Sequence, residues 1–349
     1  MDADRLRIFC VIPAFRAAGT IADVVVQALR YADDVVVVDD GCPERSGSVA
    51  ENACRGVETV HVLRRERNGG VGAAMKTGIA YCIERGADII VKLDADGQMD
   101  ASFIPIIRDL FGADATLVCI KGNRFFDSSV ILRMPKHRLF GNAVLSVLAK
   151  FASGYWNIID PTNGYLAFNA RLLALLPWGS FADSYFFEIS ALCELGLKRL
   201  PILELEMPTI YTGARSSLSI PRVMWDFPRK LLRLILRRVF LQYFVFDVNL
   251  GSIYLVLGTL LLLGGGAWGG SQWIVSSVTH ESRSTGTVML AVLPFLMGFQ
   301  LILNALMYDV QFAQKTSHEL LVNLYRRFPG SAKVPTAAAS GAGATHVRT

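Results

Sequence analysis

Two aspartates and a glutamine follow a short aliphatic run in the first third of the chain. The run covers residues 87–93, and Asp94, Asp96 and Gln98 come directly after it. The run predicts a buried strand, which would place these side chains at the strand's carboxyl end, where open α/β sheets bind ligands. Hard oxygen ligands suit Mg²⁺ or Mn²⁺. The motif therefore predicts a divalent cation that bridges two phosphates, although an ordinary turn after a strand can have the same residues.

Further ligand-type residues stand where other strands are expected to end. Pro13 and Phe15 follow the first aliphatic run and can wall a flat base. Asp39 and Asp40 end the second run and can accept hydrogen bonds from a base or a ribose. The glycine-rich segment 68–72 precedes a helix and can let the backbone approach a phosphate, but it lacks the Lys-Ser/Thr pair of a Walker P-loop. Each group alone also fits a turn, yet together they predict one ligand site.

The motifs require strands that alternate with helices. Aliphatic and β-branched runs predict strands at 7–12, 34–39, 57–63, 88–93 and 116–121. Helical spacing predicts helices at 20–31, 72–85 and 101–111. This alternation predicts a doubly wound, Rossmann-like and mostly parallel sheet.

Later segments predict two amphipathic helices. In the helix at 139–151, one side is expected to carry Phe140, Val144, Val147, Leu148 and Phe151. A further helix at 184–195 and a strand at 203–207 come between the two amphipathic helices. From residue 221 a basic helix separates Arg229, Lys230, Arg233 and Arg237 from Leu231, Leu232, Ile235, Leu236, Val239 and Phe240. Such a helix just before a membrane span is expected to lie in the membrane interface.

The C-terminal third contains two long uncharged stretches. Hydrophobic residues make up 52% of the chain, and no charged residue occurs at 248–279 or 284–308. Each stretch exceeds the roughly 20 apolar residues that cross a bilayer, so we expect two transmembrane helices. Basic residues flank the pair, at 229–238 before it and at 315, 326, 327 and 333 after it. The positive-inside rule then places both termini and the N-terminal domain in the cytoplasm.

Charge and cysteine content narrow the class of protein. The net charge of +5 is explained by the basic residues beside the spans, so nucleic-acid binding is not expected. The first fifty residues contain charges throughout and no apolar signal-peptide segment. The six cysteines include no C-x-x-C pair, which favours reduced thiols over disulfides or zinc ligands.

The ordered set of motifs resembles glycosyltransferase family 2, whose members have a GT-A fold. The motifs are Val-Ile-Pro at 11–13, Val-Asp-Asp-Gly at 38–41, Asn-Gly-Gly-Val-Gly at 68–72 and Asp-Ala-Asp-Gly-Gln at 94–98. More narrowly, the chain is similar to the polyprenyl-phosphate glycosyltransferases, which include dolichol-phosphate mannose synthases and undecaprenyl-phosphate sugar transferases. The resemblance covers about residues 7–228.

The resemblance implies roles for individual residues. Catalytic roles fall on Asp94, beside the sugar, and on Arg124, which binds phosphate. The metal, Mg²⁺ or Mn²⁺, is expected at Asp96 and Gln98. The nucleotide pocket is expected to contain Pro13, Phe15, Asp39, Asp40, Gly72 and Asp96. The acceptor phosphate is expected to meet Arg133 or Arg138, with Arg215 in the position of a basic residue in a late loop.

The resemblance also implies the reaction. A hexose would pass from a UDP- or GDP-sugar to a polyprenyl phosphate, with inversion, at the cytoplasmic membrane face. A phosphate's second pKa is about 6, so the acceptor is largely ionised and needs no strong general base. Relatives often carry a carboxylate where this chain has Ala17, which leaves the choice between UDP and GDP open.

Three other functions are less consistent with the sequence. A processive polysaccharide synthase would carry a Gln-x-x-Arg-Trp motif and more spans, and the motif is absent here. A nucleotidyltransferase would need a glycine-rich basic loop after the first strand. A catalytically silent membrane scaffold would be expected to lose its acidic residues, but Asp94, Asp96 and Gln98 are all present.

The predicted organisation has four parts. A GT-A catalytic domain covers 1–220, a juxtamembrane amphipathic region 221–247, two transmembrane helices 248–310, and a cytoplasmic tail 311–349 whose end is expected to be disordered. The spans leave lipid-facing surface, so membrane lipid and a second copy of the chain are both candidate partners.

Overall fold

One mixed sheet organises the N-terminal part of the computed structural model, which describes residues 5–125, 136–207 and 220–311. Within these residues, seven strands pair in the order β3-β2-β1-β4-β6-β5-β7. They are β1 (Ile8–Ala14), β2 (Asp34–Asp39), β3 (Val60–Arg64), β4 (Ile89–Lys92), β5 (Cys119–Asn123), β6 (Leu166–Asn169) and β7 (Ile202–Glu206). Only β6 runs antiparallel to its neighbours β4 and β5 among these strands. The mostly parallel sheet expected from the sequence is confirmed.

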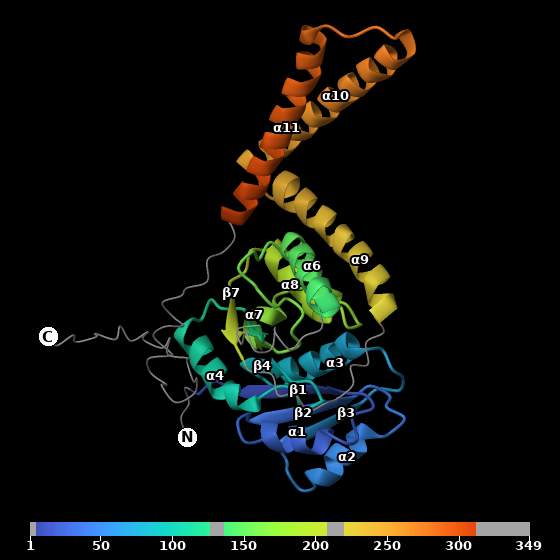
Figure 1. Ribbon diagram of the computed structural model, residues 1–349. Helices are drawn as coiled ribbons and strands as arrows, with labels where there is room; N and C mark the ends of the chain where they lie inside the picture. The colour runs from blue at the N-terminus through green and yellow to red at the C-terminus, as the bar shows by residue number, and fades with distance from the viewer. Residues whose placement is uncertain (1–4, 126–135, 208–219, 312–349) are drawn as a thin grey trace, which may run out of the picture. The chain divides into compact units, whose positions relative to one another are not determined.

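Helices cover both faces of this sheet (Figure 1). α3 (Val71–Glu84) packs on β1, β2 and β4, whereas α1 (Ile21–Ala28) and α2 (Ser46–Ala53) contact β1, β2 and β3 from the other face. The other elements of this part are η1 (Ala101–Phe103), α4 (Ile104–Ala113), α6 (Lys136–Ser153), α7 (Ala170–Ala174), η2 (Trp178–Ser180) and α8 (Phe187–Leu197).

Local hydrogen bonds explain where the strands differ from prediction. β3 begins at Val60 rather than at residue 57, because a turn precedes it in which Val60 N donates to the Val57 carbonyl. β5 begins at Cys119, since the Asp114 side chain binds Thr116 in a turn. β6 and α2 are not among the predicted elements. Both are short, and neither contains enough apolar residues to show a period.

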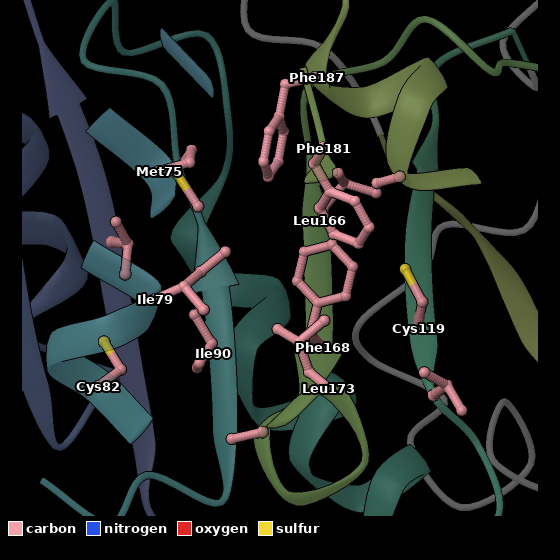
Figure 2. Close-up of a cluster of buried hydrophobic side chains, with 14 of the residues drawn as sticks. Met75, Ile79, Cys82, Ile90, Cys119, Leu166, Phe168, Leu173, Phe181 and Phe187 are labelled. Carbon is pink, nitrogen blue, oxygen red and sulfur yellow. The ribbon is translucent and has the colours of Figure 1, made fainter. Parts of the chain in front are cut away.

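The main hydrophobic core lies where α3, α7 and α8 meet the sheet. Figure 2 shows Met75, Ile79 and Cys82 of α3 gathered with Ile90 of β4 and Phe168 of β6. All five side chains are fully buried. Apolar burial contributes about 25 cal/mol per Å², so this cluster fixes β4 and β6 side by side. The six cysteines are all buried free thiols, as expected.

The apolar residues of α6 face both ways. Phe140, Val144 and Val147 are 72%, 44% and 50% exposed, so this part of the expected apolar side does not face the protein interior. Leu148, from the same expected side, packs with Leu145, Ala149 and Ala152 against α8 and α9 (Ile220–Phe240). The expected apolar side is therefore only partly buried.

α9 has the same two-sided character. Leu231 is fully buried against α6 and α8, whereas Leu232, Leu236 and Phe240 are 57%, 61% and 60% exposed. Arg237 forms an ion pair with Glu194 of α8. The helix is therefore bound to the sheet-bearing part on one side and presents an apolar stripe on another.

Two long apolar helices follow a π-helical turn, η3 (Leu241–Val245). They are α10 (Leu250–Thr279) and α11 (Thr285–Gln311), with mean hydropathies of 1.8 and 2.0 over their most apolar windows. Glycines recur every seventh residue on α10, at Gly251, Gly258 and Gly265, and all three are buried. A side chain at Gly258 would lie 3.0 Å from the Gly298 carbonyl oxygen of α11. The glycines let the two backbones approach, as in packed membrane helices.

A buried ion pair joins α9 to the end of α11. Arg238, 6% exposed, pairs with Asp309 and donates to the Phe151 carbonyl at 2.8 Å. Tyr243 and Trp156 each donate to the Asp309 carboxylate at 2.8 Å. A buried charge needs such partners, because burial without them costs several kcal/mol.

We predict that Gly196→Ala destabilises the protein by about 1–3 kcal/mol, the usual cost of overpacking. A methyl group at Gly196 in α8 would overlap the Ser153 carbonyl oxygen at the end of α6. The midpoint of thermal unfolding, measured in detergent, is the readout. Gly141→Ala in α6 is the matched control, because no atom lies within 4 Å of the added group. Equal midpoints for the two variants would contradict this account of the packing.

Candidate active site

The predicted site residues meet at one edge of the sheet. Pro13 lies in β1, Asp39 ends β2, Asp94 follows β4, and Arg124 directly follows β5. Because β6 runs in the opposite direction, the segment that enters it, residues 160–165, lies at the same edge. β1 and β4 are neighbours whose connections leave in opposite directions, which is where open α/β sheets bind ligands.

The carboxylates of Asp39 and Asp40 both bind backbone N–H groups. Asp39 accepts from Cys42 N at 2.7 Å and from Gly47 N at 2.8 Å. Asp40 accepts from Gly69 N and Gly70 N, the latter at 2.7 Å, and pairs with Arg65 at 2.6 Å. Both aspartates are buried. They hold the loops that begin α2 and α3, and a direct contact of either with a nucleotide stays a prediction.

Protein packing accounts for the glycine at position 72. A side chain there would overlap the Ala182 carbonyl oxygen, and Ala73 N donates to the Asp183 carbonyl at 3.0 Å. Gly70 has a φ of 96°, which favours glycine. The segment 68–72 is thus fitted against residues 182–184, and the phosphate contact predicted for Gly72 is not tested by this arrangement.

Pro13 and Phe15 lie at the carboxyl end of β1, at the same edge of the sheet. Phe15 is 39% exposed, and the Arg16 guanidinium lies 5.5 Å from the centre of its ring. Pro13 is half-buried within β1. An exposed aromatic ring at a strand end can stack on a base. The position of these two residues suits that role, and their contact with a base stays a prediction.

Asp94, Asp96 and Gln98 occupy a tight turn after β4. Asp96 accepts from Gln98 N at 3.0 Å, and Gly97 has a φ of 73°. Burial raises the pKa of Asp96 above its ordinary value, with a further increase from the Asp94 charge, while the Gln98 N–H opposes the shift. Asp94 forms an ion pair with Lys92.

The donor set suits a hard divalent cation with an incomplete protein shell. Within the described ranges, no three His, Cys, Asp or Glu side chains come together as a metal-binding group. Mg²⁺ is commonly held by one or two carboxylates and completes its shell with water and substrate phosphates. Carboxylate and amide oxygens of Asp96 and Gln98 fit that pattern.

Two buried lysines lie under the site. Lys92 of β4 is 1% exposed, and its ammonium contacts Asp94, Glu188 at 3.1 Å and the Gly164 carbonyl at 3.0 Å. Lys121 of β5 is fully buried and donates to the Asn163 carbonyl. Burial alone would lower the pKa of Lys92, but Asp94 and Glu188 outweigh it and raise that pKa. Burial lowers the pKa of Lys121.

Sequence reasoning did not assign roles to these lysines. The available signal was a lysine in each of two otherwise apolar runs, 89–93 and 117–121. Glu188, the partner of Lys92, lies on α8, nearly a hundred residues away in the sequence. The sequence contains no indication of that pairing.

Arg124 is held by the segment before β6. Its Nε lies 2.9 Å from the fully buried Asp160 carboxylate, and it donates to Thr162 Oγ1 at 3.0 Å. Its guanidinium lies 5.2 Å from the centre of the Phe125 ring. The side chain is 28% exposed, so it can also meet a ligand at the sheet edge.

The other predicted basic residues are less well placed by the structure. Arg133 and Arg215 lie outside the described residues. Arg138 lies in the first turn of α6, and its side chain is likewise outside the described part. The structure therefore brings together Asp94, Asp96 and Arg124 but does not test the acceptor-phosphate roles of the three arginines.

Known proteins with similar sequences act on lipid phosphates. The profile of "Glycosyl transferase family 2" matches residues 9–175. The UDP-N-acetylglucosamine–dolichyl-phosphate N-acetylglucosaminyltransferase of Methanococcus voltae is 31% identical over 229 residues, which cover 60% of this chain and 88% of that protein. The undecaprenyl-phosphate mannosyltransferase of Micrococcus luteus is 29% identical over 188 residues, 53% of this chain and 75% of that protein.

A third relative extends the same pattern. The polyprenol monophosphomannose synthase of Mycolicibacterium smegmatis is 29% identical over 157 residues, covering 44% of this chain and 58% of that protein. The residues matched by the family profile contain most of β1, the strands β2 to β6 and the carboxylate turn described above. This chain therefore belongs to glycosyl transferase family 2 and is a glycosyltransferase.

Proposed function

We propose that this protein transfers a hexose from a nucleotide-diphosphate sugar to a polyprenyl phosphate at the cytoplasmic face of a membrane. The product would be a polyprenyl-phosphate sugar with an inverted anomeric centre. The observation that carries the proposal is the sheet edge at which the Asp94–Asp96 turn lies with Arg124, in a chain that continues into two apolar helices. The names of the three relatives support the same kind of donor and acceptor.

On the donor side, the proposal uses the residues at the ends of β1, β2 and β4. Pro13 and Phe15 would wall the base, and Asp39 and Asp40 would shape the pocket through the loops they hold. Asp96 and Gln98 would hold Mg²⁺ or Mn²⁺, which supplies charge neutralisation on the diphosphate leaving group. Asp94 would lie beside the sugar, where its negative charge favours the positive charge that develops at the anomeric carbon.

On the acceptor side, the chain must hold an anion close to a second anion. The acceptor phosphate is largely ionised, so its oxygen can form the new bond to the anomeric carbon while the bond to the nucleoside diphosphate breaks. Arg124 would bind that phosphate, because a guanidinium presents donors in a planar fork. We propose Arg133, Arg138 and Arg215 as further cations for the acceptor phosphate. Because this phosphate is already ionised, Asp94 is a positioning group rather than a base.

The proposed membrane arrangement follows from the apolar helices and the charges beside them. α10 and α11 are mostly exposed to the surroundings, as membrane-spanning helices would be. We propose the four-part division 1–220, 221–247, 248–310 and 311–349, with both termini in the cytoplasm. The exposed apolar residues of α6 and α9, such as Phe140 and Leu236, support a catalytic domain that lies on the lipid surface.

The first prediction from the proposed function concerns the reaction itself. We expect radiolabel from UDP-glucose, UDP-N-acetylglucosamine or GDP-mannose to enter organic-extractable lipid when purified protein, undecaprenyl phosphate and Mg²⁺ or Mn²⁺ are combined. Chelation by EDTA should abolish transfer, and Asp96→Asn should lower it by at least about 100-fold, the scale of a lost charge-stabilising group. Asp23→Asn, which changes an exposed carboxylate on α1, should leave the rate unchanged.

Other outcomes would favour other functions. Label only in insoluble polymer would favour a processive polysaccharide synthase. No transfer from any of these donors, in wild type and Asp96→Asn alike, would leave either a rarer donor sugar or a catalytically silent scaffold.

The second prediction concerns Arg124. We expect Arg124→Lys to raise the apparent KM for undecaprenyl phosphate about tenfold, because lysine keeps the charge but cannot bind Asp160 and Thr162 together while it meets a phosphate. Steady-state kinetics with varied acceptor check this. Arg171→Lys is the matched control, since Arg171 pairs with Asp88 on the surface with a side chain that is 79% exposed. A normal acceptor KM in Arg124→Lys would argue against the acceptor role.

The third prediction concerns self-association. In α11, Gln300 donates to Asn304 at 3.2 Å, and Gln300 is exposed. On a helical wheel Gln300 lies about 200° from Gly298, which faces α10, so the amide pair points toward lipid. Amide groups in lipid favour hydrogen bonds to another helix. We expect wild type to be oligomeric in nanodiscs by single-molecule photobleaching and Gln300→Leu to shift it toward monomer, with Met297→Leu as the unshifted control.

A further inference from the structure

Lys92 places a positive charge inside the sheet. The preceding residues of β4, Ile89, Ile90 and Val91, are aliphatic and buried, and Lys92 itself is 1% exposed. Burial of an ammonium group costs several kcal/mol unless partners neutralise it and accept its hydrogen bonds. A lysine at this position therefore needs a dedicated set of partners.

The partners of Lys92 come from three separate segments. Asp94 belongs to the turn after β4, Glu188 to the first turn of α8, and Gly164 to the segment that enters β6. An ammonium has three N–H donors, and these three oxygens match that number. Lys92 thus joins the donor-side turn to the segment that holds Arg124.

Gly164 is fitted to this ammonium. A side chain at position 164 would lie 3.0 Å from Lys92 Nζ and would also press on the Asp94 carboxylate. The Gly164 carbonyl, the Lys92 ammonium and the Asp94 carboxylate are therefore packed together, with no room for a side chain at position 164. Any shift of one of them moves the others.

The charges of the group leave one negative charge at the site. Asp94 and Glu188 carry two negative charges and Lys92 one positive charge, and the Asp94 side chain is still 33% exposed. Asp94 can therefore face a ligand while one of its oxygens is held from below.

We propose that Lys92 is a positioning residue that fixes the Asp94 carboxylate, and with it the donor sugar, relative to the segment carrying the acceptor-side residues. The proposal rests on the proposed function, because it assigns Asp94 to the donor side. Lys92 acts through Asp94 and does not contact substrate. Glu188 completes the arrangement by neutralising Lys92 from α8.

A purely structural role is the competing explanation, and the chain offers a matched control for it. Lys121, in the middle of β5, is also fully buried and donates to the adjacent carbonyl, that of Asn163. Its Nζ contacts this backbone oxygen rather than Asp94. Replacing either lysine by methionine removes a buried ammonium of the same size at the same depth.

The test compares Lys92→Met, Lys121→Met, Asp94→Asn and the double variant Lys92→Met/Asp94→Asn in the full-length protein. We expect Lys92→Met to lower kcat by about 100-fold with donor KM changed less than about threefold, the effect of a misplaced reacting group. Lys121→Met should cost less than about tenfold in kcat at a similar loss of melting temperature. The double variant should be no slower than Asp94→Asn alone, because two residues that act as a unit are not additive.

Three results would overturn the inference. The first is a kcat of Lys92→Met near that of wild type. The second is an equal loss of kcat in Lys92→Met and Lys121→Met. The third is a double variant in which the effects of Lys92→Met and Asp94→Asn on kcat multiply. Titration with UDP and GDP shows whether each variant is folded and binds nucleotide. If Lys92→Met does not fold, Gly164→Ala replaces it, with Gly179→Ala as control because nothing lies within 4 Å of that position. A wild-type kcat in Gly164→Ala then contradicts the proposal.

Failure of the proposed function has a different signature. It appears as an absence of lipid product with the wild-type protein. The same variants are then compared by release of nucleoside diphosphate through donor hydrolysis, and an unchanged rate in Lys92→Met overturns the positioning role there as well.

Discussion

Two ammonium groups without access to water determine how the ligand edge of this sheet is built. Lys92 ends β4 and Lys121 lies in the middle of β5, the two strands that flank β6, and each requires an oxygen from the chain. β6 runs opposite to its neighbours, so the segment that enters it passes between the two lysines and supplies the Asn163 and Gly164 carbonyls. This segment also contains Asp160, which holds Arg124. The direction of one short strand therefore connects the carboxylate turn to the basic residue opposite it.

The sequence predicted those parts of the fold that local patterns determine. The aliphatic runs located β1, β2, β3, β4, β5 and β7, and the two uncharged stretches located α10 and α11. β6 was missed because four residues do not display a period, and its reversed direction depends on pairing with both neighbours. Likewise, nothing in the spacing of Phe140 and Val144 indicates that these two residues are exposed while Leu148 and two alanines face α8 and α9.

The sequence predicted which strand ends carry the candidate site residues, but not which contacts the side chains of these residues make. Asp39 and Asp40 show why. A carboxylate at the end of a parallel strand faces the N-terminus of the next helix, where backbone N–H groups are unpaired. The same position suits a ligand and a loop anchor, and here both carboxylates bind backbone N–H groups. Lys92 and Glu188 are far apart in sequence, so only the fold could reveal that they meet.

The ion pair between Arg238 and Asp309 has a consequence for how the protein is made. The two residues are 71 positions apart, with both apolar helices between Arg238 and the end of α11. The sheet-bearing part, including Arg238, is therefore synthesised before Asp309, which is its counter-ion. Removing one partner of a buried pair costs about 3–5 kcal/mol, so the nascent chain reaches its full stability only when the hairpin has been synthesised. A chain without the folded hairpin therefore leaves the charge of Arg238 without its counter-ion.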